Sequence, residues 1–200
     1  NVIDKYKSMT DEQIRCALHK TKNPISVCME HWKGDFNIST LIRNANAFNV
    51  EKVFYVGKKR IDIRGAVGSH HYIDILHVPN GVCELVDLKK YYTFIAIDNN
   101  ISKTKKLSEF CWSSLEKPPL VFFGEEGLGL TEEALNICDY RIEIQQYGSV
   151  RSLNVGTSSG LVLYELSQHL KNSIVYDRWQ TALRGENENA LNESCQLTLL

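Results

Sequence analysis

The chain has 200 residues, of which 43% are hydrophobic and 24% are charged, and its formal net charge is −1. This length and composition suit one domain with a buried core, and the balanced charge argues against a strongly basic wrapper of nucleic acid while permitting a local basic patch. The sequence has neither a run of 18 apolar residues nor the basic-then-apolar start of a signal peptide. We therefore expect a soluble protein of a reducing compartment, cytoplasmic or within the nucleus or an organelle. Because residue 1 is Asn rather than Met, a longer parent protein stays open.

Six cysteines show neither a CxxC pair nor the spacing of a metal site, which predicts buried free thiols. They are Cys16, Cys28, Cys83, Cys111, Cys138 and Cys195. The histidine segment "RGAVGSHHY", with His77 farther on, has no carboxylate or thiolate at ligand spacing. We expect no bound metal.

In chain order, the apolar pattern predicts alternating helices and strands. Thr10 and Gln13 form a capping-box pattern that opens a helix through about Lys20. Further helices are predicted at 37–48, near 81–90, after Thr131 as N-cap, and from Leu153 to Leu170. The apolar runs "ISVCME", "KVFYV", "YIDILHV", "YTFIAID", "PLVFF" and "RIEI" are typical of buried strands. This alternation predicts an α/β fold, with a mostly parallel sheet and helices on both faces.

The helix "NISTLIRNANAF", residues 37–48, contains an arginine that points away from its apolar side. At about 100° per residue, the apolar side chains share one side and Arg43 lies opposite them. Taken alone, it is a solvated Arg on an amphipathic helix. The helix from Leu153 to Leu170 is apolar nearly all round in its middle, so it packs centrally or against another subunit.

Polarity rises beyond Lys171, and "RGENENALNES" has no clear periodicity, which predicts a loosely held tail. The expected organisation is an N-terminal helical extension at 1–24, a main domain at 25–171 and a C-terminal tail at 172–200.

Two glycine-containing joints follow predicted strands. The first, "LVFFGEEGLGLTEEAL", has the order GxxGxG, which is neither the dinucleotide-binding fingerprint nor a P-loop. Closely spaced glycines still let backbone approach a ligand, and two glutamates favour a neutral or cationic ligand over a phosphate. The second, "RIEIQQYGSVRSLNV", places Ser152 and Asn154 before a helix, where either could simply cap the helix.

Basic residues gather in "EKVFYVGKKRIDIRG" and "SKTKK". Each segment follows a strand-like run, so both are expected on loops at one edge of the sheet. They either solubilise the surface or bind phosphate groups.

Taken together, three segments in sequence order resemble the SPOUT superfamily, specifically its SpoU or TrmH branch of RNA ribose 2′-O-methyltransferases. In the first, Asn37 is followed six residues on by Arg43. The second, "FFGEEGLGL", supplies Gly124, Glu126, Gly127 and Gly129. The third, "IQQYGSVRSLNV", supplies Ile144, Gly148, Ser152, Leu153 and Asn154, with Gln145 where the family commonly has Pro. The matches extend over about residues 25 to 170.

The resemblance implies a SPOUT fold whose C-terminal segment threads a deep trefoil knot, a recognised exception to the rarity of knots. It implies S-adenosylmethionine as cofactor and a homodimer that shares the active site. The implied catalytic residues are Arg43, Asn37, Glu126, Ser152 and Asn154. The implied cofactor-binding residues are Asp98, Asn99, Gly124, Gly129, Ile144, Gly148 and Leu153.

In the family, the arginine that matches Arg43 is assigned to the transfer step, sometimes as general base. A guanidinium is effectively always protonated, so we favour Arg43 as a clamp on the adjacent phosphate that also stabilises the forming alkoxide. The resemblance favours tRNA over rRNA, which stays possible, and the basic loops supply the expected RNA-binding residues Lys58, Lys59, Arg60 and Arg64. Three alternatives stay open: a non-catalytic RNA-binding member, a base N-methyltransferase of the wider superfamily, and, least supported, a nucleotide-dependent oxidoreductase.

Overall fold

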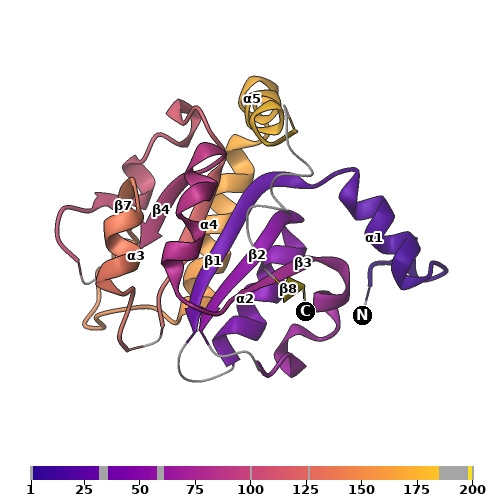
Figure 1. Cartoon of the computed structure of the whole chain (residues 1–200), viewed down its shortest axis with the longest axis horizontal. Helices are drawn as coiled ribbons and strands as arrows, with labels where there is room; N and C mark the ends of the chain where they lie inside the picture. Colours follow the sequence, from indigo (N-terminus) through magenta and orange to yellow (C-terminus); the bar gives the residue numbers. More distant parts are fainter. Residues whose placement is uncertain are drawn as a thin grey trace.

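The computed structural model describes residues 2–31, 36–57, 61–99, 101–125, 127–184 and 198–199. Its centre is a sheet with the strand order β5-β7-β4-β6-β1-β2-β3-β8 (Figure 1). The strands are β1 (Asn23–His31), β2 (Val50–Gly57), β3 (Asp74–Val78), β4 (Thr93–Ile97), β5 (Lys105–Lys106), β6 (Pro119–Phe123), β7 (Tyr140–Glu143) and β8 (Thr198–Leu199). Neighbours among β1 to β7 pair in parallel, and β8 pairs antiparallel with β3. The predicted, mostly parallel sheet is confirmed.

Helices flank the sheet at nearly all the predicted places. The α-helices are α1 (Asp11–His19), α2 (Phe36–Ala47), α3 (Glu132–Ile137), α4 (Val155–His169) and α5 (Ser173–Arg184). The 3-10 helices are η1 (Asp4–Tyr6), η2 (Arg64–Ala66), η3 (Ser69–Tyr72), η4 (Val82–Lys90), η5 (Leu107–Glu109) and η6 (Trp112–Ser114). The segment near 81–90 is thus helical but 3-10 in type. Its buried residues Val82, Leu85 and Leu88 recur every three positions, which matches the 3-10 period.

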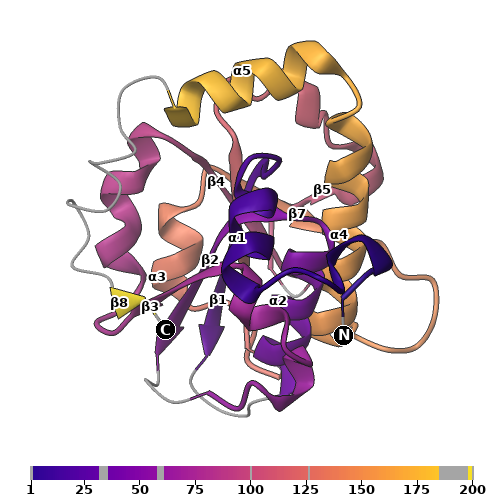
Figure 2. The same ribbon diagram turned by 90° about the vertical axis from the view of Figure 1, so that its right-hand side faces the viewer.

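Both faces of the sheet are covered, because the strands alternate their side chains between two cores. On β1, Val27 and Met29 enter one core and Cys28 enters the other. The first core is closed by α2, α4 and α5, and the second by η4 and α3. Figure 2 shows α3 on one side of the strands and α2 and α4 on the other. This arrangement confirms the prediction of helices on both faces.

Helix α5 occupies residues that the sequence assigns to the tail. Val175, Trp179 and Leu183 are buried, and the Trp179 indole N–H donates to the Leu115 carbonyl at 2.9 Å. The helix lies across the top of the molecule in Figure 2. Residues 173–184 therefore belong to the folded core, and the tail expected from residue 172 does not begin there. Residues 185–197 lie outside the described part of the chain.

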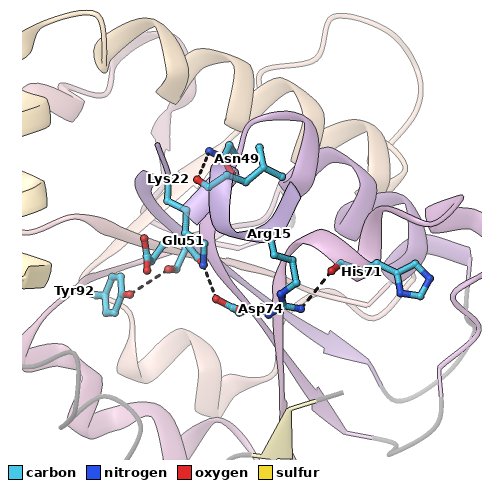
Figure 3. A network of polar contacts seen from close by, with 9 residues as sticks. Arg15, Lys22, Asn49, Glu51, His71, Asp74 and Tyr92 are labelled. Atoms are coloured by element: carbon cyan, nitrogen blue, oxygen red, sulfur yellow. Dashed lines mark hydrogen bonds and ion pairs between the residues drawn. The ribbon is translucent and has the colours of Figure 1, made fainter. Parts of the chain in front are cut away.

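Helix α1 is attached to the sheet by a polar network (Figure 3). Its capping box of Thr10 and Gln13 is present as predicted. Arg15 and the buried Lys22 converge on the Asp74 carboxylate at 2.6 and 2.5 Å. Burial acts to raise the pKa of Asp74, but the charges of Lys22 and Arg15 prevail and lower it. The N-terminal segment is thereby held to the start of β3.

Burial of the cysteines is only partly as expected. Cys28 is buried and Cys138 is half-buried, whereas Cys16, Cys83 and Cys111 are exposed free thiols. The prediction of burial was wrong for these three, because each lies on the solvent side of its helix or loop. Cys195 lies outside the described residues. Within the described part, none of the helices is long and apolar enough to cross a membrane.

Candidate active site

A cavity lies at the carboxyl ends of β4 and β6, the edge at which open α/β sheets bind ligands. Three segments distant in sequence line it: residues 97–99 at the end of β4, residues 123–125, 127 and 129 at the end of β6, and residues 152, 153, 155 and 158 at the start of α4. The predicted site residues among its lining are Asp98, Asn99, Gly124, Gly129, Ser152 and Leu153. The fold therefore brings together segments from two of the three motifs and from the loop after β4.

The glycine loop, which we define as residues 124–125 and 127–130, is closed by a pair of backbone hydrogen bonds. The Glu125 N–H donates to the Gly129 carbonyl at 3.0 Å, and the Gly129 N–H donates back to the Glu125 carbonyl at 2.9 Å. Gly129 has φ +73°, and a Cβ at Gly124 would lie 2.1 Å from the Gly129 carbonyl carbon. Only glycine fits at these two positions, as the sequence pattern suggests.

Two carboxylates hold the end of this loop. The Leu130 N–H donates to Asp98 at 3.1 Å, and Thr131 donates its N–H and its hydroxyl to Glu30, both at 2.7 Å. Burial raises the pKa of Glu30, which the Thr131 hydrogen bonds oppose and the nearby Glu133 and Glu125 reinforce. Sequence reasoning missed Glu30, although a lone acidic residue near the end of an apolar strand is the signal that could have found it.

Asn99 fastens the loop after β4 to β7. Its amide donates to the Ile144 carbonyl at 2.7 Å, and its side-chain oxygen accepts from the Ile144 N–H at 3.0 Å. The Ile144 N–H is thus used within the protein. The Ile144 carbonyl oxygen has a second lone pair, which is available to accept a hydrogen bond from a ligand.

The first and third motifs meet at the start of α4. Asn154 is the N-cap of this helix, and its side-chain oxygen accepts from the N–H groups of Gly156 and Thr157 at 2.9 and 3.3 Å. Its amide donates to the Asn37 side-chain oxygen at 2.8 Å. Asn154 therefore caps the helix and also joins two segments 117 residues apart in sequence. Asn37 lies in the first turn of α2, which begins at Phe36.

Helix α2 presents Arg43 on its exposed side while its opposite side is buried. Leu41, Ile42 and Ala45 have no exposed area, as the sequence pattern predicts. The next residue, Asn44, donates to the Gly156 carbonyl at 2.8 Å and to the Ser159 hydroxyl at 3.0 Å. A Cβ at Gly156 would lie 2.6 Å from Thr40. The helix that displays Arg43 is thus packed closely against the helix that Asn154 caps.

Some predicted residues lie apart from the cavity. Gly148 is exposed, and a Cβ there would meet nothing within 4 Å. Arg64 donates to both oxygens of Asp62 at 3.0 and 2.9 Å, and chiefly this side-chain hydrogen bonding lowers the pKa of Asp62 to about 2. Glu126, Lys58, Lys59 and Arg60 lie outside the described residues.

The cavity is acidic and partly apolar. Its lining includes Ile97, Phe123 and Val155, and the carboxylates among its described lining residues are those of Asp98 and Glu125. Neither Lys nor Arg occurs among the described lining residues. The sequence pattern did not single out Glu125 as a site residue, although it adjoins Gly124. In the described ranges, we find no group of three or more His, Cys, Asp or Glu side chains placed to hold a metal ion.

The mostly parallel sheet, the helices on both of its faces and the glycine-lined cavity at its carboxyl edge define an α/β protein, and comparison with known sequences identifies the family. The sequence model of the SpoU rRNA Methylase family matches residues 24–164. The chain belongs to this family.

Relatives cover most of the chain. The tRNA (guanosine(18)-2′-O)-methyltransferase of Aquifex aeolicus strain VF5 is 29% identical over 171 residues, which are 84% of this chain and 80% of that enzyme. The enzyme of the same name from Escherichia coli strain K12 is 28% identical over 175 residues, which are 84% of this chain and 74% of that enzyme.

Solved structures show the same fold. The crystal structure of the A. aeolicus TrmH/SpoU tRNA modifying enzyme has a TM-score of 0.71 at 26% identity, and the match covers 88% of this chain and 93% of that one. The SpoU methyltransferase AviRb from Streptomyces viridochromogenes, in complex with AdoMet, has a TM-score of 0.65 at 22% identity, covering 76% of this chain and 60% of that one.

Proposed function

We propose that this protein is an S-adenosylmethionine-dependent RNA ribose 2′-O-methyltransferase that acts on tRNA. One observation carries the proposal: the Asn154–Asn37 hydrogen bond joins the helix that displays Arg43 to the cavity where the glycine loop and the start of α4 meet. Membership of the SpoU family and the names of the A. aeolicus and E. coli relatives support the reaction and the RNA class.

The cavity fits this cofactor. When bound, S-adenosylmethionine supplies the methyl group and carries a positive sulfonium. Gly124, Gly127 and Gly129 line the cavity with backbone, and Phe123, Leu153 and Val155 offer apolar area for an adenine ring. The carboxylates of Asp98 and Glu125 suit a ligand with positive charge. We assign Gly148 and the Ile144 carbonyl to the outer part of this site.

Arg43 acts at the ribose of the target nucleotide. Its guanidinium is exposed and positively charged, so it holds the phosphate beside the target nucleotide and stabilises negative charge as the 2′-hydroxyl loses its proton to that phosphate or to water. Asn37 and Asn154 hold the start of α2 against the start of α4, and we assign Ser152 to contact with RNA or with Arg43. Glu126 is proposed to hold the loops together.

The test is transfer of labelled methyl groups from S-adenosylmethionine to separate tRNA and rRNA pools. We expect label in alkali-resistant dinucleotides of tRNA, lost in Arg43→Ala and kept in the control Arg184→Ala, which removes an exposed arginine at the end of α5. Label on a base would favour an N-methyltransferase. Cofactor binding without any transfer would favour the non-catalytic RNA-binding reading.

The clamp role of Arg43 has its own test. Arg43→Lys keeps the charge but loses the planar pair of donors, so we expect a large fall in kcat. A variant that keeps most of its kcat with an unchanged pH profile would contradict the clamp.

The remaining assignments concern shape and assembly. We propose that the segment from β7 into α4 forms a deep trefoil knot, in line with the TM-score of 0.71 to the A. aeolicus enzyme. We also propose a homodimer, because Leu161 and Tyr164 of α4 are 43% and 57% exposed. We propose that the methyltransferase domain comprises residues 25–171 together with helix α5.

Arg64 and the segment 58–60 are proposed to contact RNA, and an RNA substrate implies an intracellular site of action.

A further inference from the structure

One buried carboxylate in the cavity has an oxygen that makes no hydrogen bond in the described structure. Glu125 is 7% exposed, and its Oε2 atom is buried without a hydrogen-bond partner in the described structure. It lines the cavity between the carboxyl ends of β4 and β6. A buried polar atom without a partner costs free energy, and a buried unpaired charge costs more, so such an atom in a binding cavity indicates a missing ligand group.

The donors at the far end of the glycine loop are already used elsewhere. The Gly129 N–H bonds the Glu125 backbone carbonyl, and the Leu130 N–H bonds Asp98. Thr131 gives both its N–H and its hydroxyl to Glu30. The described lining of the cavity also offers neither Lys nor Arg as a partner for the Glu125 carboxylate.

We propose that the Glu125 carboxylate pairs with a positively charged group of the methyl donor and thereby selects a cationic cofactor. The inference rests on the function proposed above and adds a specificity-determining residue to it. S-adenosylmethionine has two positive groups, the ammonium of its amino-acid part and the sulfonium. S-adenosylhomocysteine, the molecule left after transfer, keeps the ammonium and has lost the sulfonium.

The experiment is calorimetric titration of wild type, Glu125→Gln and Glu132→Gln with both molecules. Glu125→Gln keeps size and removes charge, and we expect its affinity for S-adenosylmethionine to fall about 10- to 100-fold. Glu132 is exposed in the first turn of α3, so Glu132→Gln makes the same charge change outside the cavity and keeps wild-type affinity. An equal loss for S-adenosylhomocysteine assigns the ammonium, and an unchanged affinity for it assigns the sulfonium. Wild-type affinity of Glu125→Gln for both molecules overturns the inference.

Thermal unfolding without ligand separates binding from a structural role. Since Glu125→Gln removes a carboxylate whose Oε2 atom is buried without a hydrogen-bond partner in the described structure, we expect its Tm to equal or exceed that of wild type while its cofactor affinity falls. A lower Tm together with weaker binding would mean that the carboxylate holds the loop, which overturns the inference. Failure of wild type to bind either molecule would overturn the proposed function as well, and that result differs from a failure confined to the variant.

Discussion

The glycine loop and the serine loop, which we define as residues 145–153, both follow parallel strands and both contain a motif glycine, yet they are built differently. The glycine loop is closed by paired backbone hydrogen bonds and held by Asp98, and it admits no Cβ at Gly124. The serine loop exposes most of its residues: Tyr147 is 89% and Val150 is 60% exposed. A motif glycine can therefore be required by the protein's own packing, or it can lie in an exposed loop where that packing leaves space for a side chain.

The largest expected difference between the two loops appears when one methyl group is added to each of them. Gly124→Ala places a Cβ 2.1 Å from backbone, so the glycine loop must move, and we expect a loss of at least about 2 kcal/mol of stability together with loss of cofactor binding. Gly148→Ala meets nothing within 4 Å and is expected to be nearly neutral in stability. Urea unfolding and calorimetry measure both. Equal losses of stability in the two variants would contradict the expected difference between the loops.

The second effect tests the support beneath the glycine loop. Glu30→Ala leaves the Thr131 N–H without its acceptor, and we expect a loss of about 1–3 kcal/mol. Urea unfolding measures the loss, and a wild-type midpoint would show that the loop does not depend on this anchor.

The same carboxylate gives a pH dependence. Because burial raises the folded-state pKa of Glu30, its contribution to stability is fully present below the ordinary glutamate pKa and is lost as pH rises through the raised value. The stability of wild type relative to Glu30→Gln should therefore increase as pH falls from neutral toward the ordinary glutamate range. Unfolding curves of the pair at several pH values check this, and a flat or opposite trend would contradict it.

The third effect lies where the serine loop enters α4. Asn154→Asp keeps an acceptor for the helix N-terminus but loses the amide that reaches Asn37, whereas Asn154→Ala loses both contacts. We expect Asp to be close to wild type in stability and Ala to lose about 1 kcal/mol. Both variants should lose methyl transfer. Full activity in Asn154→Asp would show that the Asn37 contact is dispensable.

The smallest effect on stability is expected in the serine loop itself. Tyr147→Ala removes an exposed ring and should change the free energy of unfolding by no more than about 0.5 kcal/mol. Its effect should appear instead in affinity for RNA or in dimerisation, measured by filter binding and by light scattering. A large loss of stability would mean that this loop, too, is packed by the protein.

Local patterns alone predicted much of the fold. The run "PLVFF" coincides with β6, and the capping residues Thr10, Thr131 and Asn154 all accept hydrogen bonds from the starts of their helices. The direction of Arg43 also followed from helical periodicity. These features depend on neighbours within a few residues along the chain, so they can be predicted from the local sequence alone.

Other features depend on partners far along the chain. Helix α5 follows a change in polarity that is typical of a tail, but Trp179 finds its hydrogen-bond acceptor at Leu115 and is fully buried. Glu30 fixes Thr131 across 101 positions, and Asn154 reaches Asn37 across 117. The sequence by itself determined which residues form strands, caps and motif glycines. Only the tertiary structure decided which of them meet, because parallel strands bring their carboxyl ends to the same edge of the sheet whatever their separation along the chain.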